Sequence, residues 1–149
     1  MELSEFNARV EYLREMRTVI VGCGRVGSNL ARWLGTEGDQ VTVVDFDERA
    51  FNRLGEDFPG DMIFGTAVDE DVLRKAGTEH ADAFVAVTNS DNTNIMAGQL
   101  ARYVFNVPKV ICRLYDPGRQ AIYKELGLET ICATTLSAEQ VRHFFENQG

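Results

Sequence analysis

Three closely spaced glycines are the residues of this sequence best suited to bind a ligand. Gly22, Gly24 and Gly27 lie in Gly22-Cys-Gly-Arg-Val-Gly27, between the apolar run Thr18–Val21 and a helical pattern. In a strand–loop–helix unit, the first glycine permits a tight turn, the second lets the backbone approach a pyrophosphate, and the third lets the helix pack close to the strand. The phosphates would then meet the free amides at the positive end of the helix. The spacing therefore predicts a dinucleotide-binding loop.

An acidic residue stands where such a loop needs one. Asp45 ends the apolar run Val41–Val44, at the separation from the glycines at which a carboxylate accepts hydrogen bonds from both ribose hydroxyls. A carboxylate there would repel a 2′-phosphate, which disfavours NADP. NAD, NADH, AMP, ADP and ATP all keep the free ribose hydroxyl and stay open as ligands. The alternative interpretation is a solvated carboxylate at a strand end.

Other polar residues flank the predicted loop. Arg25 takes an exposed position inside it, where a guanidinium could reach phosphates bound by its own or a neighbouring subunit and detect their number. The run Ala83–Val87 ends in Thr88 and Asn89, at the point where strand order should reverse and ligands bind in open α/β sheets. The alternatives are a surface arginine, and turn formation and capping by Thr88 and Asn89.

The cysteines indicate reduced thiols. Cys23, Cys112 and Cys132 are odd in number and widely spaced, without a Cys-x-x-Cys pair, so neither a disulfide framework nor a zinc site is expected. Cys23 would lie near a helix N-terminus, where the pKa of a thiol can fall. A redox role for Cys23 is therefore a minor alternative.

The elements that must position these residues alternate between strands and helices. This alternation predicts an α/β fold with a Rossmann-type, doubly wound parallel sheet of about six strands and helices on both faces. The expected strands are Thr18–Val21, Gln40–Asp45, Met62–Phe64, Ala83–Val87, Val110–Arg113 and Thr130–Cys132. The expected helices are Val26–Thr36, Glu48–Leu54, Glu70–Lys75, Asn92–Phe105, Gly118–Leu126 and Ser137–Asn147.

Capping residues support these boundaries. Asp69, Asp91 and Ser137 stand where an N-cap accepts hydrogen bonds from the first turn of a helix. Glycines follow several helices, where a left-handed residue is often needed. These are Gly35 or Gly38, Gly55 and Gly77.

The two ends of the chain carry amphipathic patterns. Residues 1–16 predict an N-terminal helix that packs on its own domain or binds a partner, ahead of a nucleotide-binding domain over 17–149. The last helix has apolar positions that could form an interface between subunits or simply cover the sheet. They are Leu136, Val141, Phe144 and Phe145.

Composition excludes several classes of function. The net charge of -8, with no basic cluster, argues against nucleic acid or an anionic lipid surface as partner. The apolar runs are too short to cross a bilayer, so no direct membrane insertion is expected. The N-terminus has neither the basic start nor the apolar stretch of a secretory signal, which predicts a cytoplasmic protein, peripheral to the inner membrane face at most.

Five segments in order carry a family resemblance. They are Gly22-Cys-Gly-Arg-Val-Gly27, Val43-Val-Asp45, Gly65-Thr-Ala67, Ala86-Val-Thr-Asn-Ser-Asp-x-Thr-Asn94 and Ile111-Cys-Arg113. Over about residues 17 to 146 the chain resembles the N-terminal nucleotide-binding domain, called RCK, KTN or TrkA-N, of Trk and Ktr potassium-uptake regulators. The stretch Ala-Val-Thr-Asn-Ser-Asp is far more specific than the glycine loop.

The resemblance implies a function and a set of ligand contacts. It implies a cytosolic regulatory subunit, a homodimer or higher ring that binds NAD or NADH, or else AMP, ADP or ATP, and gates a membrane-embedded potassium transporter or channel. The implied contacts are Gly22, Cys23, Gly24, Arg25 and Val26 for phosphates, Asp45 for ribose, Thr66 and Ala67 beside the adenine, and Thr88, Cys112 and Arg113 completing the site.

The chain departs from the family pattern in two ways. Many relatives have Gly-Asp-Ala-Thr where this chain has Gly65-Thr-Ala-Val68, which removes a polar group near the base. Full-length regulators also carry a second ligand-binding domain, which we do not expect within a sequence that ends at Gly149.

Other functional classes remain as alternatives. One is a small NAD-dependent oxidoreductase completed by dimerisation, and another is a structural module without ligand. Six strands and their helices use nearly all 149 residues, whereas dehydrogenases usually add a substrate domain. His80 and His143 fall before the fourth strand and on the last helix, away from the strand carboxyl ends where a general acid or base would be needed. We therefore expect a sensor and not an enzyme.

Overall fold

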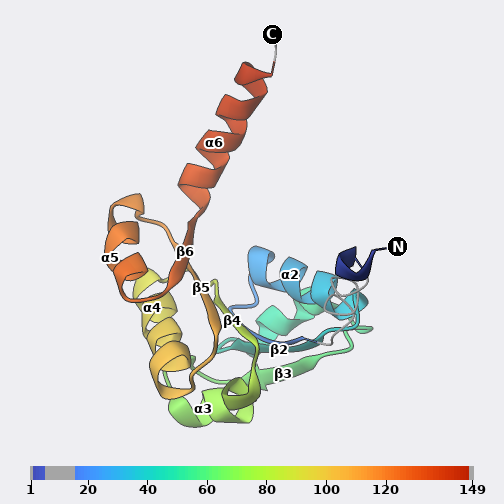
Figure 1. Ribbon diagram of the computed structural model, residues 1–149. Helices are drawn as coiled ribbons and strands as arrows, with labels where there is room; N and C mark the ends of the chain where they lie inside the picture. The colour runs from blue at the N-terminus through green and yellow to red at the C-terminus, as the bar shows by residue number, and fades with distance from the viewer. Residues whose placement is uncertain (1, 6–15, 148–149) are drawn as a thin grey trace.

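One parallel sheet organises the molecule. The computed structural model describes residues 2–5 and 16–147 (Figure 1). Its strands are β1 (Arg17–Val21), β2 (Gln40–Asp45), β3 (Asp61–Phe64), β4 (Ala83–Ala86), β5 (Lys109–Leu114) and β6 (Glu129–Cys132). They pair in the order β3-β2-β1-β4-β5-β6, all parallel. The Rossmann-type fold predicted from the sequence is confirmed, and strand order reverses between β1 and β4.

Helical segments connect the strands. They are α2 (Arg25–Thr36), the 3₁₀ helix η1 (Glu48–Leu54), α3 (Glu70–Lys75), the 3₁₀ helix η2 (Thr78–His80), α4 (Asp91–Gln99), the π-helix η3 (Leu100–Val104), the 3₁₀ helix η4 (Pro117–Arg119), α5 (Gln120–Glu125) and α6 (Ala133–Glu146). Residues 3–5 are also helical, but most of the helix expected over 1–16 lies outside the described residues.

The alternating side chains of the strands feed a core on each face of the sheet. In β1, Val19 and Val21 join a cluster with Leu73 of α3 and Ala97 of α4. Ile20 points the opposite way and packs with Ala31 of α2 and other residues of α2 and η1. Side chains at successive strand positions point to opposite faces, so one apolar strand supplies both cores. Burial on both faces explains the continuous apolar runs that made the strands easy to predict.

Two predicted N-caps are wrong. Ser90, not Asp91, caps α4, because the Ser90 hydroxyl accepts a hydrogen bond from Thr93 N at 3.2 Å. The Asp91 carboxylate instead accepts from the Tyr115 and Asp116 amides. Ser137 lies inside α6, which follows β6 directly and starts at Ala133, so its hydroxyl cannot reach the first turn.

Other boundary predictions hold. Asp69 caps α3 by accepting from Asp71 N at 2.8 Å. Gly38, Gly55 and Gly77 have φ of +88°, +81° and +81°, as expected after helices, whereas Gly35 lies within α2. The helix expected over Asn92–Phe105 closes with a wider π turn, in which Phe105 N donates to Leu100 O.

The last helix projects away from the sheet (Figure 1). None of its residues is buried, and its apolar side chains are 52 to 75% exposed. These side chains are Leu136, Val141, Phe144 and Phe145. The interpretation that they cover the sheet of their own chain is therefore wrong.

The two serines give a paired test of the corrected helix starts. Ser90→Ala should lower the free energy of unfolding by about 1 kcal/mol, because it removes the N-cap of α4. Ser137→Ala should change it by less than about 0.5 kcal/mol, because alanine suits an exposed helix interior. Urea denaturation followed by circular dichroism measures both. A larger loss for Ser137→Ala would contradict the start of α6 at Ala133.

Candidate functional site

The glycine loop turns the chain sharply from β1 into α2. Gly22 has φ of +104°, and a Cβ there would lie 2.9 Å from Thr88 N. A Cβ on Gly27 would overlap the Gly22 carbonyl oxygen, so helix and strand meet with no room for a side chain. A Cβ on Gly24 would meet nothing within 4 Å, which leaves open space over the middle of the loop. Each glycine thus has the environment that the sequence motif predicts.

The open space faces the start of α2. Gly24 is the N-cap and contributes no side-chain hydrogen bond, and the first turn holds no acidic residue. The first helical bond runs from Ser28 N to Gly24 O at 2.9 Å. The amides of Arg25, Val26 and Gly27 precede it and have no intrahelical partner. They present three donors and the positive end of the helix dipole, a combination that suits a phosphate.

Asp45 joins the end of β2 to this loop. Its Oδ2 accepts from Cys23 N, and its Oδ1 accepts from Asp47 N, both at 2.8 Å. The residue is half-buried, so its carboxylate is held in one orientation at the carboxyl edge of the sheet. Each carboxylate oxygen has a further lone pair. Asp45 can therefore accept ribose hydroxyls without giving up its backbone bonds.

Two adjoining hollows form a cleft over these groups. One, of about 210 Å³, reaches the loop after β3 and is lined there by Gly65, Thr66 and Ala67. The other, of about 220 Å³, lies against the glycine loop. Together they have the size of a small-molecule site. The residues that line both are Gly22, Asp45, Phe46, Thr88 and Asn89.

A buried amide organises the far wall of the cleft. Asn94, fully buried on α4, accepts from Thr88 N at 2.9 Å and from the Thr88 hydroxyl at 2.6 Å. Its side-chain nitrogen donates to Thr88 O at 3.1 Å and to Arg113 O at 2.9 Å. One side chain thus fixes the ends of β4 and β5 against each other. The sequence motif contained Asn94, but it did not indicate that this side chain would be buried and hydrogen-bonded to the residues that line the cleft.

Two arginines line the hollow that lies against the glycine loop. Arg113 Nη2 donates to Thr88 O at 2.7 Å, and its Nε is buried without a partner among the described residues. Arg53 of η1 donates to Cys23 O at 3.4 Å and lines the same hollow. Sequence reasoning missed Arg53, because only the fold of η1 brings it to the loop. Arg25 is exposed at the start of α2 and lines neither hollow.

The remaining expected contacts differ in how far they face the cleft. Thr66 and Ala67 both line the cleft, but Thr66 is exposed, whereas Ala67 is 5% exposed and belongs to the core. Cys112 is fully buried, and its thiol donates to Asn94 O. Adjacent strand residues point to opposite faces, so Cys112 faces α4 while Arg113 faces the cleft. The backbone of Cys23, rather than its buried side chain, faces the loop.

The redox interpretation of Cys23 is wrong in its premise. Burial, with the nearby Asp45 carboxylate as a second cause, raises the pKa of the Cys23 thiol to about 11. The thiol also donates to Ala50 O at 3.3 Å, away from the helix start. The helix dipole therefore does not activate this side chain.

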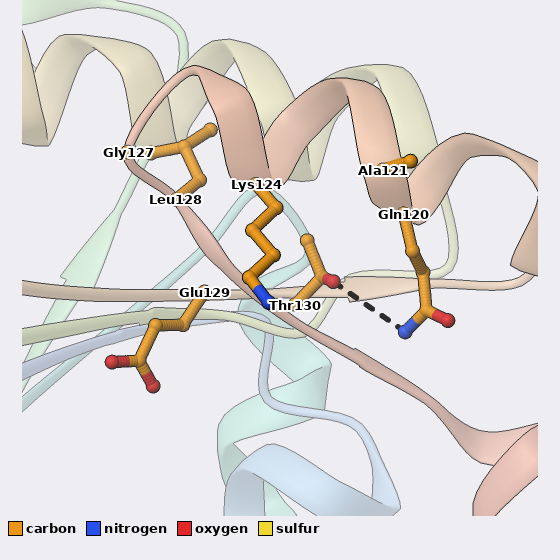
Figure 2. Close-up of a pocket in the computed structure, with 7 residues that line it drawn as sticks. All are labelled: Gln120, Ala121, Lys124, Gly127, Leu128, Glu129 and Thr130. Carbon is orange, nitrogen blue, oxygen red and sulfur yellow. Dashed lines mark hydrogen bonds between the residues drawn. The ribbon is translucent and has the colours of Figure 1, made fainter.

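A second groove lies between α5 and β6 (Figure 2). It is larger, about 640 Å³, and Gln120 donates to the Thr130 hydroxyl at 3.4 Å across it. Figure 2 shows Lys124 extending from α5 towards β6, with Glu129 pointing away. None of the residues predicted to bind a ligand lines this groove. The glycine loop, the Asp45 carboxylate and the two arginines lie instead at the smaller cleft.

The fold and the strand–loop–helix at its first crossover define a Rossmann-type domain. The family model described as the TrkA-N domain matches residues 18–134, and the chain belongs to that family. Among the described residues, no helix is long and apolar enough to cross a membrane.

Curated relatives agree with this assignment. The chain is 46% identical over 126 residues to the Trk system potassium uptake protein TrkA of Streptomyces coelicolor, covering 85% of this chain and 56% of that protein. It is 34% identical over 127 residues to the TrkA homolog of Pyrococcus horikoshii, with the same coverage of 85% and 56%. The chain thus spans about half the length of these relatives.

Solved structures share the fold. The C-terminal domain of Kef from Shewanella denitrificans, in an AMP-bound form, superposes with a TM-score of 0.72 at 23% identity, over 84% of this chain and 76% of that one. The GsuK channel bound to NAD gives 0.66 at 18% identity, over 78% and 21% of the two chains. GsuK bound to ADP gives 0.73 at 19% identity, over 100% and 40%.

The buried amide gives a test of how the cleft is held. Asn94→Asp should lower the free energy of unfolding by about 3 kcal/mol at pH 7, because a buried carboxylate would face two carbonyls that now accept hydrogen bonds. Burial raises the pKa of such a carboxyl in the folded state, so the deficit relative to wild type should shrink as pH falls and the group becomes neutral.

Asn92→Asp is the matched control on the same helix. Asn92 is exposed, so this change should leave the free energy of unfolding within about 0.5 kcal/mol of wild type. Denaturant titrations at pH 7 and pH 4.5 measure all three proteins. Equal effects of the two substitutions would contradict the role assigned to Asn94.

Proposed function

We propose that this domain binds a nucleotide in the cleft at the first crossover and acts as a regulatory module of a potassium transport system. One observation supports this most strongly: three unpaired helix amides, an oriented Asp45 carboxylate and two arginines converge on one cleft. They complement phosphates and a ribose, the parts that all candidate nucleotides share. The names of the curated relatives point to potassium uptake as the regulated process.

The ligand lies across both hollows in this proposal. Its phosphates meet the loop from Gly22 to Val26, with Arg53 and Arg113 on either side, and its ribose hydroxyls donate to Asp45. The adenine lies towards Thr66 and Ala67, and Phe46 supplies an apolar surface there. NAD, NADH, AMP, ADP and ATP all fit this scheme. Arg25 detects phosphate number, on its own subunit or a neighbour.

Regulation then follows from differential affinity. A nucleotide can shift the equilibrium between two conformations of an assembly only by the difference in its binding free energy for the two. The proposed partner is a membrane-embedded transporter or channel, with this domain on the cytoplasmic side. An NAD-dependent oxidoreductase completed by dimerisation is the competing function, and it would turn over substrate. His80 is exposed at the amino edge of the sheet beside Glu79, and His143 lies on α6, so neither supports it.

Calorimetric titration with AMP, ADP, ATP, NAD, NADH and NADP tests the proposal. Wild type should bind a nucleotide with a free ribose hydroxyl more tightly than NADP. Asp45→Asn should weaken that binding by about tenfold to a hundredfold, because a charge-assisted hydrogen bond contributes roughly 1.5–3 kcal/mol.

Asp82→Asn is the matched control for this titration. Asp82 also accepts a backbone amide, from Arg17 at 2.9 Å, but at the amino edge of the sheet. Its substitution should leave nucleotide affinity unchanged. Failure of every nucleotide to bind wild type would overturn the proposal and leave a structural module, whereas product formation by purified protein would favour the oxidoreductase.

The homodimer of this proposal uses α6. Its four apolar side chains are more than half exposed and meet no other described part of the chain closely enough to be buried. Burying such side chains contributes about 1.5–3 kcal/mol each, which favours packing against a second copy. The double change Phe144→Ser, Phe145→Ser should therefore halve the mass found by light scattering.

Trp33→Ser is the control for self-association. Trp33 is 68% exposed on α2, so its loss removes a comparable apolar surface elsewhere. Its mass should equal that of wild type. A monomeric wild type, or a dimer indifferent to the α6 changes, would contradict the interface.

A further inference from the structure

An apolar groove lies beside the outer edge of the sheet at β3. The groove, of about 620 Å³, runs between η1 and β3. It is separate from the nucleotide cleft and shares none of its lining residues. Its lining combines four large apolar side chains with two carboxylates and includes no lysine or arginine. The lining residues are Glu48, Phe51, Asn52, Gly55, Glu56, Phe58, Met62 and Phe64.

Large apolar side chains are exposed along this edge. Met62 and Phe64 point to the same face of β3 and are 51% and 64% exposed. Phe64 lies in register with Asp45, directly before Phe46, which is 70% exposed. Met62 and Phe64 together form what we call the edge cluster, whereas Phe46 lines the nucleotide cleft. Contiguous exposed apolar surface of this kind marks interaction sites in folded domains.

The backbone of β3 offers a second means of attachment. β3 ends the strand order, and nothing in the described part of the chain pairs with its outer side (Figure 1). Exposed edge strands are usually protected by charged residues, especially lysine, yet Met62, Ile63 and Phe64 carry no charge. An extended segment could therefore add to the sheet here. Because β3 has only four residues, the groove must supply much of the binding free energy.

The charges of the groove select its occupant. Glu48 and Glu56 line it, and Asp61 begins β3, so the surroundings are acidic in a chain of net charge -8. The apolar face of α6 from a second copy is a poor match, because that helix carries Glu139 and Glu146 against one arginine, Arg142. Carboxylates would then face carboxylates at the rim. A basic segment with apolar side chains fits both the charge and the cluster.

We propose that the groove and the edge cluster bind an extended segment of another protein in which lysine or arginine flanks a short apolar run. The apolar side chains then lie on the edge cluster, and the flanking basic side chains approach Glu48 and Glu56, which line the same groove. Cytoplasmic loops of membrane proteins are enriched in lysine and arginine, so a loop of the transport partner has this chemistry. That identification of the source rests on the proposed function, whereas the chemistry of the occupant does not.

Fluorescence anisotropy with a synthetic peptide tests the proposal. The probe is a labelled peptide in which lysines flank a short run of valines, measured at physiological salt beside a counterpart with glutamates in place of the lysines. Wild type should bind the lysine peptide and not the glutamate peptide. The double changes Met62→Ser, Phe64→Ser and Glu48→Lys, Glu56→Lys should each weaken binding by about tenfold or more, because the first removes the anchors and the second reverses the charge.

Matched controls separate this site from general attraction to an acidic protein. Met96→Ser removes an apolar side chain that is 52% exposed on α4, and Glu37→Lys with Glu125→Lys makes the same change of charge away from the groove. Both should bind the peptide as wild type does. Equal weakening by groove and control variants, or no binding of the lysine peptide by wild type, would overturn the proposal.

Two further measurements decide between related outcomes. A lower mass by light scattering for Met62→Ser, Phe64→Ser would assign the groove to a second copy and contradict the proposal. Nucleotide titration of the same variants should match wild type, which shows that they are folded. If the peptide binds but no nucleotide does, this site is supported and the proposed function fails. If a nucleotide binds but the peptide does not, the proposed function is supported and this site fails.

Discussion

The cleft depends on one buried amide. Strand ends of a parallel sheet have no ladder hydrogen bonds beyond their last pair, so the loops that follow them need other partners. Asn94 supplies these partners to Thr88 and Arg113 with four hydrogen bonds. Asp45 does the same for the glycine loop by accepting from Cys23 N. The rigid positions on both sides of the strand-order reversal thus come from side chains that replace missing backbone pairing.

Most of the fold could be predicted because its signals are local. Buried parallel strands appear as short apolar runs, and the predicted ranges match β1 to β6 within one residue at each end. The errors occur where neighbouring residues suit the same role. Ser90 and Asp91 are both good caps, and only the path of the chain into α4 decides between them. The start of α6 has no side-chain cap, so the sequence around Ala133 contained no capping signal that would predict it.

The site was predictable where the spacing of residues along the chain marks it. Gly22, Gly27 and Asp45 are recognised by spacing, and their geometry matches that spacing. Arg53 became visible only in three dimensions, because η1 brings its guanidinium to the loop from a distant position in the chain. The contrast between Cys112 and Arg113 could have been foreseen, since adjacent strand residues face opposite sides. Family resemblance named both without distinguishing them.

In the proposed homodimer, the projecting α6 would couple secondary structure to assembly. Isolated helices of about 14 residues are marginal in water and depend on packing for most of their stability. Because no residue of α6 is buried among the described residues, the stability of this helix in such a dimer would come from the partner copy. Dilution would then unwind this one element and leave the sheet intact. The concentration of the protein would set how much of α6 is helical.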